Sequence, residues 1–245
     1  MASFVRNGVS IHFEELGSGF PLLLLAPGGL DSTIDFWPRA ALNPIEAFAD
    51  DFHLVAMDQR NAGSSTGPFE PDDPWGSFVG DQIALMEHLG FDRFLVVGCC
   101  IGCSYALKIA ELVPERLVAA VLEQPIGITE ENRETWLTSR RTWVSKLVSH
   151  RPDLDEETGE AFGAAMWTGG EFVVSVSREF VQSCPTPLMV LPGVDMMHPY
   201  EIGREVGILA PDAVTVDPWK DPPEALSRAT NEVRQFLHEH AEAAL

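Results

Sequence analysis

Basic residues are scarce in this chain. Its 245 residues include 16 lysines and arginines against 37 aspartates and glutamates, a formal net charge of −21. Nucleic-acid binding requires a basic surface that pairs with phosphates, so this balance argues against a nucleic-acid partner. Long apolar runs are also missing. No stretch approaches the ~20 residues of a membrane span, and residues 1–13 hold no apolar core of signal-peptide length. We therefore expect no membrane partner and a cytoplasmic location.

Cysteine is rare as well, and the few cysteines are grouped. Of the four, three occupy positions 99, 100 and 103, an arrangement too small and too clustered for a disulfide framework. Reduced thiols are typical of a cytoplasmic protein. No second cluster of cysteine and histidine completes a zinc-binding pattern. The sequence therefore predicts neither a metal site nor a cofactor.

What the sequence does contain is an alternation of strand-length apolar runs with helix-length amphipathic stretches. Such alternation predicts an α/β fold with a mainly parallel sheet covered by helices on both faces. Ligands of these sheets bind at the carboxyl ends of the strands. The predicted strands are 21–26, 52–57, 94–97, 117–122, 187–191 and 213–216 after a hairpin over 3–15, and the predicted helices include 44–48, 78–89, 105–112 and 223–240.

The alternation stops between residues 126 and 183. Trp136, Trp143 and Leu147 follow helical spacing, and further helices are expected over 161–167 and 172–181. We interpret 126–183 as a helical lid inserted into a core formed by 1–125 and 184–245. The aromatic side chains of this lid are explained more simply by core packing than by substrate contact. Trp136 and Trp143 are nevertheless candidates for substrate binding.

The most informative stretch is Gly98-Cys99-Cys100-Ile101-Gly102. A strand-like apolar run precedes it and a helical stretch follows, which is the pattern of a nucleophile elbow with cysteine in place of serine. The two glycines allow strand and helix to approach closely at a sharp turn. Cys100 then stands at the positive end of a helix, so we expect its thiol pKa to be lowered. Tight packing of buried thiols is the simpler alternative.

Four motifs in order give the chain a family resemblance. Pro27-Gly28-Gly29 is similar to a His-Gly turn without its histidine, and the segment from Asp58 to Ser64 is similar to Asp-x-Arg-Gly-x-Gly-x-Ser. The elbow follows, and Leu191-Pro192-Gly193-Val194-Asp195 is similar to the end of the strand that carries a catalytic acid. Together they resemble the α/β-hydrolase superfamily over nearly the whole length. The resemblance implies a nucleophile at Cys100 and an acid at Asp195.

The histidine of that family normally follows the last strand, but residues 216–222 contain none. Of the seven histidines, His198 is the one expected in a loop at the carboxyl edge of the sheet, three residues after Asp195. Elimination therefore favours His198 as the base. Lys220, in the vacated position, is a second candidate base and a candidate contact for substrate.

The predicted site combines a thiol, an imidazole and a carboxylate. Cys100 is the candidate nucleophile, His198 the general acid and base, and Asp195 the group that orients the imidazole. Since a spacing of three residues is unusual for that contact, Glu123 and Asp217 are alternative carboxylates. The alternative to a catalytic role is structural: Asp195 would cap its own loop, and His198 would stand at the start of a helix.

Backbone N–H groups complete the predicted site. The resemblance implies that Gly29 and Ile101 donate to the oxyanion of a tetrahedral intermediate. Arg60 and Asn61 are interpreted as structural supports of neighbouring loops.

Two classes of function follow. The favoured one is a cofactor-independent hydrolase that acts on a small-molecule ester, thioester or lactone through an S-acyl-cysteine. The alternative keeps the fold without hydrolysis, as in a lyase, cyclase, isomerase or small-ligand receptor, because fold does not fix function. A homodimer is left open.

Overall fold

The computed structural model describes residues 2–28, 31–151, 153–168 and 172–244. Within these residues the chain forms an eight-stranded sheet in the order β1-β2-β4-β3-β5-β6-β7-β8. The β1–β2 and β2–β4 pairs are antiparallel and the remaining pairs are parallel, which confirms the predicted fold class. The strands are β1 Ala2–Arg6, β2 Val9–Gly17, β3 Pro21–Leu25, β4 His53–Met57, β5 Phe94–Cys99, β6 Leu117–Glu123, β7 Leu188–Leu191 and β8 Ala213–Thr215.

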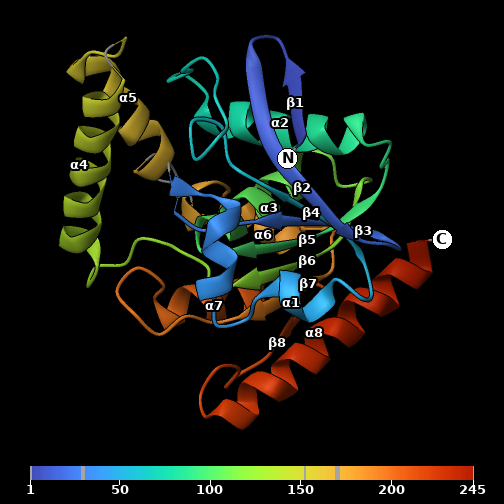
Figure 1. The fold of residues 1–245 in the computed structure, drawn as a ribbon. Helices are drawn as coiled ribbons and strands as arrows, with labels where there is room; N and C mark the ends of the chain where they lie inside the picture. The colour runs from blue at the N-terminus through green and yellow to red at the C-terminus, as the bar shows by residue number, and fades with distance from the viewer. Residues whose placement is uncertain (1, 29–30, 152, 169–171, 245) are drawn as a thin grey trace.

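Helices cover both faces of this sheet (Figure 1). β3 is buried throughout because its side chains alternate between two cores. Leu23 and Leu25 pack with helices on one face, whereas Leu22 and Leu24 pack with helices on the other. The first face carries α2 Pro74–His88, α3 Ile101–Leu112 and α7 Tyr200–Leu209, and the second carries α1 Pro44–Phe48 and α8 Pro223–Ala244.

Several predicted helices have different bounds in the structure. The helix predicted over 105–112 begins at Ile101, and the one predicted over 161–167 begins at Glu156. α2 begins at Pro74, four residues before the expected start, because the Asp73 side chain caps the helix and Pro74 fits its first position. The continuous helix predicted over 172–181 is wrong. It is divided into η3 Phe172–Val174 and α6 Arg178–Ser183, since Val173 and Val174 adopt positive φ values of 47° and 61°.

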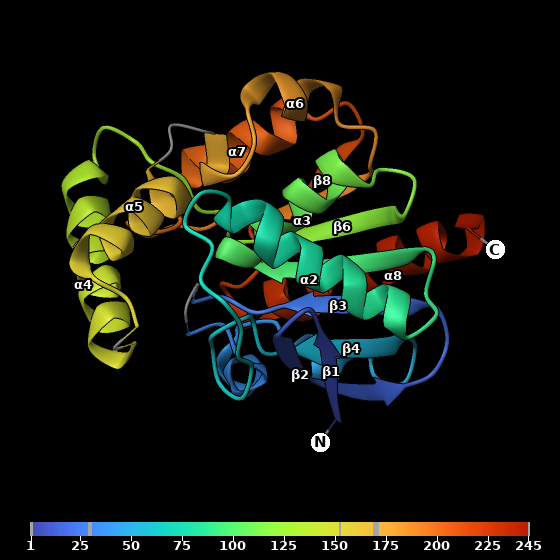
Figure 2. The same ribbon diagram turned by 90° about the horizontal axis from the view of Figure 1, so that it is seen from above.

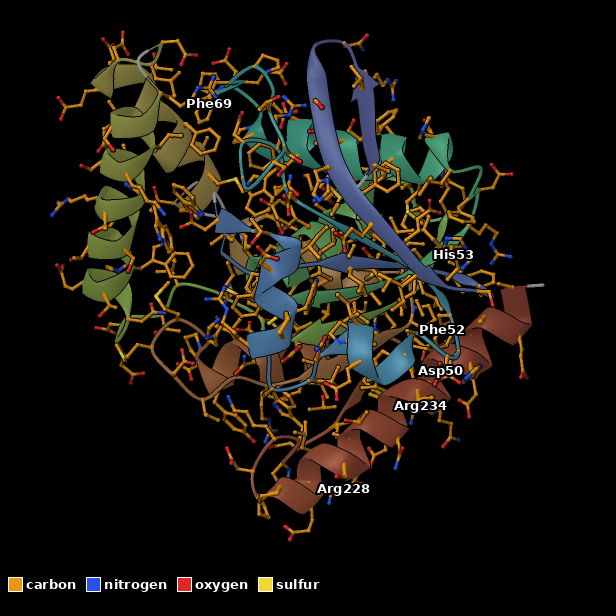
Figure 3. The ribbon with its side chains drawn as sticks, in the orientation of Figure 1. Asp50, Phe52, His53, Phe69, Arg228 and Arg234 are labelled. Atoms are coloured by element: carbon orange, nitrogen blue, oxygen red, sulfur yellow. The ribbon has the colours of Figure 1, made fainter. Side chains whose placement is uncertain are left out.

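Helices α4 Arg133–His150 and α5 Glu156–Trp167 are inserted between β6 and β7. Figures 1 and 2 place them together beside one edge of the molecule. They pack closely because α5 presents glycines to α4: a Cβ at Gly163 would lie 2.4 Å from a methyl carbon of Val144. Phe69, labelled in Figure 3, joins the insert to the core, since its ring centroid lies 4.4 Å from that of Phe162 on α5.

Across the described residues, none of the helices has the length and apolar character needed to cross a membrane.

Candidate active site

The turn between β5 and α3 is as sharp as predicted. Cys100, at the N-cap of α3, has φ 58° and ψ −117°, a backbone conformation that costs energy for any residue with a side chain. A Cβ at Gly98 would lie 2.3 Å from the carbonyl oxygen of Gly102, and a Cβ at Gly102 would lie 2.0 Å from that of Leu25. Glycine is therefore required at both positions for strand, turn and helix to fit together.

Cys100 differs from the other cysteines in its surroundings. Cys99, Cys103 and Cys184 are buried, whereas Cys100 is partly exposed. The Cys103 thiol is directed into the protein, where the carbonyl oxygens of Gly98 and Glu123 each lie 3.2 Å from its sulfur. Packing thus explains Cys99, Cys103 and Cys184, while Cys100 reaches a cavity.

That cavity has a volume of about 130 Å³ and almost entirely apolar walls. Residues from the sheet loops form one side and the insert helices the other. Trp136 and Trp143 of α4 both line it, so the two candidate lid aromatics lie over Cys100, although Trp136 is also fully buried. The lining residues are Gly28, Cys100, Ile101, Ile126, Trp136, Trp143, Trp167, Met197 and His198.

His198 and Asp195 form a local pair in the loop after β7. The Nδ1 atom of His198 lies 2.8 and 2.9 Å from the two oxygens of Asp195. Asp195 Oδ1 also accepts hydrogen bonds from the backbone N–H groups of Met197 and His198. The carboxylate therefore caps its own loop and orients the imidazole at once. A Cβ at Gly193 would lie 2.3 Å from Cβ of His198, so glycine is needed where the loop folds back.

The other ring nitrogen of His198, Nε2, makes no hydrogen bond to Asp195. Because a carboxylate only accepts hydrogen bonds, Nδ1 carries the proton and Nε2 is the basic nitrogen of the neutral ring. Nε2 is buried and has no hydrogen-bond partner among the described residues. Burial by itself raises the pKa of Asp195, but the hydrogen bond and charge of His198 and two backbone N–H groups lower that pKa below its ordinary value.

The predicted lowering of the Cys100 pKa is wrong. The pKa of this thiol is raised to about 12, chiefly by burial and to a smaller extent by the carboxylates of Asp195 and Glu123. The N–H groups of Ile101 and Gly28 act in the opposite direction but do not outweigh the loss of hydration. Loss of hydration in an apolar cavity disfavours a thiolate more than one helix end favours it.

The same two N–H groups bear on the predicted oxyanion hole. Ile101 and Gly28 each have a backbone N–H beside the sulfur of Cys100. The predicted second donor, Gly29, lies outside the described residues. Gly28 has φ 109°, which favours glycine, and its carbonyl oxygen accepts the N–H of Asp31 in a turn. The Gly28-Gly29 pair indicated a turn in the sequence, but only the folded loop shows that the Gly28 N–H lies beside the sulfur.

The comparisons with known proteins agree with this architecture. A sequence profile described as alpha/beta hydrolase fold matches residues 21–171. The chain belongs to the α/β hydrolase fold family. It is 34% identical over 107 residues to a soluble epoxide hydrolase of a Corynebacterium species, which covers 42% of this chain and 34% of that protein. The chain thus spans about a third of the length of that curated relative.

Solved structures of the same fold cover the whole chain. The meta-cleavage product hydrolase CumD of Pseudomonas fluorescens IP01 is similar with a TM-score of 0.70 and 20% identity, over 98% of both chains. The enol-lactonase of Burkholderia xenovorans LB400 is similar with a TM-score of 0.67 and 18% identity, over 97% of this chain and 100% of that one. At these identities the likeness concerns the fold.

In this α/β-hydrolase-fold protein none of the remaining candidate residues has a hydrogen bond or ion pair to His198 within the described residues. Lys220 is absent from the lining of the cavity and instead donates to Gln124 Oε1 at 2.5 Å. Asp217 accepts a hydrogen bond from the hydroxyl of Tyr200. Glu123 is 1% exposed. Among the candidate carboxylates, Asp195 alone contacts His198 within the described part of the chain.

The buried Glu123 has unusual electrostatics. Burial raises the pKa of its carboxyl to about 8, although Leu42 N–H, Lys220 and Cys99 favour the charged form. Neither carboxyl oxygen makes a hydrogen bond of ordinary geometry within the described residues.

Arg60 is structural as predicted, since it forms a buried two-point contact with Asp81. No three His, Cys, Asp or Glu side chains of the described residues are grouped so as to hold a metal ion.

Proposed function

We propose that this protein is a cofactor-independent hydrolase that cleaves a small-molecule ester, thioester or lactone through an S-acyl intermediate on Cys100. The observation that carries the proposal is the state of His198. Its Nδ1 is held by Asp195, its buried Nε2 has no hydrogen-bond partner among the described residues, and His198 is one of the residues that line the cavity beside Cys100. This arrangement supports Cys100 as the nucleophile, His198 as the base and Asp195 as the carboxylate that orients the imidazole.

The pKa of Cys100 determines how the nucleophile is activated. With a thiol pKa of about 12, the thiolate fraction at neutral pH is on the order of 10⁻⁵. A resting ion pair of thiolate and imidazolium is therefore disfavoured. His198 instead removes the S–H proton as the sulfur attacks, in the manner of a serine enzyme.

The reaction proceeds in two halves. As the sulfur bonds to the carbonyl carbon, Nε2 of His198 takes the thiol proton and the carbonyl electron pair moves to oxygen. The N–H groups of Ile101 and Gly28, which lie beside the sulfur, donate to that oxygen. Collapse of the intermediate breaks the bond to the leaving group, which receives the proton from His198.

Water completes the cycle. His198 removes a proton from water as its oxygen attacks the thioester carbon, and the same oxyanion donors hold the second intermediate. The C–S bond then breaks, the carboxylic acid departs, and the proton on His198 returns to the sulfur of Cys100. Asp195 stabilises the imidazolium in both halves.

The insert helices supply the roof of the site. We assign 126–183 as a lid over a core of 1–125 and 184–245, because Trp136 and Trp143 meet Cys100 and His198 across one apolar cavity. An apolar wall favours a substrate whose group beside the scissile bond is also apolar.

Trapping of the acyl-enzyme tests the proposal. Intact-mass spectrometry after brief exposure to activated short-chain esters and thioesters should show a mass increase equal to one acyl group, with peptide mapping to Cys100. Cys100→Ala should show neither the increase nor turnover, whereas Cys184→Ala, at a buried cysteine outside the cavity, should keep both. Turnover retained by Cys100→Ala would contradict covalent catalysis.

A non-hydrolytic protein, as a lyase, isomerase or small-ligand receptor, is the second candidate. It is favoured by the raised pKa of the Cys100 thiol, which keeps the sulfur protonated and weakly nucleophilic at neutral pH. Ligand binding in the cavity without acylation or release of an acid would support this alternative.

A further inference from the structure

Two cavities share one tryptophan in their walls. Trp143 lines the inner cavity of about 130 Å³ that contains Cys100 and His198. It also lines a wider cleft of about 650 Å³. Among the residues that line the two spaces, Trp143 alone is shared. The outer cleft is lined by Asp31, Asn61, Ala62, Gly63, Ser65, Thr66, Gly67, Trp143, Lys146, Leu147 and Arg151.

The ring of Trp143 is held in place by other aromatic rings. Its centroid lies 6.3 Å from that of Trp136 in an edge-on contact and 4.9 Å from that of Trp167 in a tilted one. Trp136 is fixed in turn, because its Nε1–H donates to the carbonyl oxygen of Trp167 at 2.7 Å. Such contacts stabilise defined ring orientations, so the Trp143 ring is held in one orientation between its neighbours.

The inner cavity is small. An apolar cavity of about 150 Å³ accommodates one benzene molecule, and the cavity beside Cys100 is slightly smaller than that. In the S-acyl intermediate the acyl group stays attached to Cys100 and must occupy this space, whereas the leaving group departs. The size limit therefore applies to the acyl group.

We propose that Trp143 is a specificity-determining partition that restricts the substrate to a short, apolar acyl group and keeps longer acyl chains out of the outer cleft. The proposal rests on the proposed function for its chemistry. The outer cleft supplies room for several further methylene groups once the partition is removed. Each newly buried methylene should then improve kcat/KM by about fourfold, the factor that corresponds to burial of one CH₂ group.

The test compares straight-chain thioesters from acetyl to decanoyl on the wild type and on Trp143→Ala. The wild type should accept acyl groups from acetyl through butanoyl and should lose activity steeply on longer chains. Trp143→Ala should raise the octanoyl-to-butanoyl ratio of kcat/KM at least tenfold. Trp143→Phe, which keeps a ring at this position, should change the ratio much less.

Val144→Ala is the matched control for loosening of the insert. Val144 is adjacent on α4 but is directed at α5, where its methyl groups meet Gly159 and Gly163, and it lines neither of the two spaces. The control should leave the chain-length ratio unchanged. An equal shift in Val144→Ala and Trp143→Ala would attribute the effect to a loosened insert and overturn the proposal.

Binding of unreactive primary alcohols tests the Trp143 partition independently of catalysis. Fluorescence of Trp136 and Trp167 reports binding to the wild type and to Trp143→Ala, and octanol should bind more tightly than butanol only in the variant. If no thioester is hydrolysed, the proposed function fails while the alcohol series still measures the partition. An alcohol preference that is the same in both proteins would overturn the partition.

Discussion

The Nδ1 atom of His198 lies 2.8 Å from Oδ1 of Asp195, although the two residues are separated by only two others in the loop after β7. The contact is made because Asp195 also accepts the backbone N–H groups of Met197 and His198, which turns the loop tightly and returns the ring to the carboxylate. The structural and catalytic interpretations of this pair are therefore compatible. In the proposed mechanism the pair replaces a histidine after the last strand.

Removal of the proposed base and nucleophile should give strongly non-additive losses. His198→Ala and Cys100→Ala should each lower kcat by several orders of magnitude, and the double variant should be little worse, because both residues act in one step. Steady-state kinetics on a short-chain thioester measures this. Lys220→Ala should have a mild effect, since its ammonium group binds Gln124 and not the cavity. The reverse ranking would assign the base to Lys220.

The reactivity of Cys100 should report its raised pKa. Under limited iodoacetamide treatment Cys100 should be the labelled cysteine, because the other three are buried. Its labelling should be slow and should still rise about tenfold per pH unit between about pH 8 and 10, since only the thiolate reacts. Peptide mapping over this range measures the rate. A plateau below pH 8 would show a lowered pKa and contradict the proposed general-base step.

Glu123 should make the fold less stable as the pH rises. The unfolded chain releases this proton near the ordinary pKa of 4.5, whereas the folded chain retains it up to its raised pKa of about 8. The unfolded state therefore gains stability over this interval, and the free energy of unfolding falls as pH increases. Denaturant unfolding at pH 5 and pH 8 measures the difference.

Glu123→Gln should reduce the change in the free energy of unfolding between pH 5 and pH 8 by a few kcal/mol, because the glutamine side chain is neutral at every pH. Glu201→Gln, at an exposed position on α7, is the control and should leave the pH dependence as in the wild type. An unchanged pH dependence in Glu123→Gln would mean that the folded protein does not hold this proton.

Glycine at the elbow should be irreplaceable even by alanine. In Gly102→Ala the new methyl group would lie 2.0 Å from the carbonyl oxygen of Leu25, so strand and helix would have to separate. We expect a loss of about 3 kcal/mol or more in the free energy of unfolding. In Gly80→Ala on α2 no heavy atom lies within 4 Å of the new methyl group, and a gain of up to about 1 kcal/mol is expected. Equal stability of the two variants would contradict the close approach at the elbow.

The sequence predicted the sheet and the elbow because both depend on local patterns. Apolar runs such as Leu22 to Leu25 are buried on both faces wherever helices cover both sides of a sheet. The turn at Cys100 required glycine at both Gly98 and Gly102, and that requirement is visible in the spacing. The position of His198 beside the cavity follows the same logic, since it lies in the loop after a strand; its role as the base stays a prediction.

The errors concern features that arise only when distant segments meet. The pKa of Cys100 depends on an apolar cavity completed by Trp136 and Trp143, which are far away in sequence. The break at Val173 involves a tertiary hydrogen bond, because the Ser104 hydroxyl on the elbow helix donates to its carbonyl oxygen at 2.7 Å. Hydration and tertiary bonding of this kind have no counterpart in local spacing.

The short loop that holds Asp195 and His198 has a consequence for the evolution of this protein. In the proposed mechanism acid and base are inherited together as one segment of the chain, and a single graft of that loop onto a related scaffold would transfer both. In that mechanism the stretch after β8 has no need of a catalytic histidine. It holds Trp219 instead, whose indole N–H binds the carbonyl oxygen of Pro192 at 2.7 Å and so secures the start of the segment that carries the chemistry.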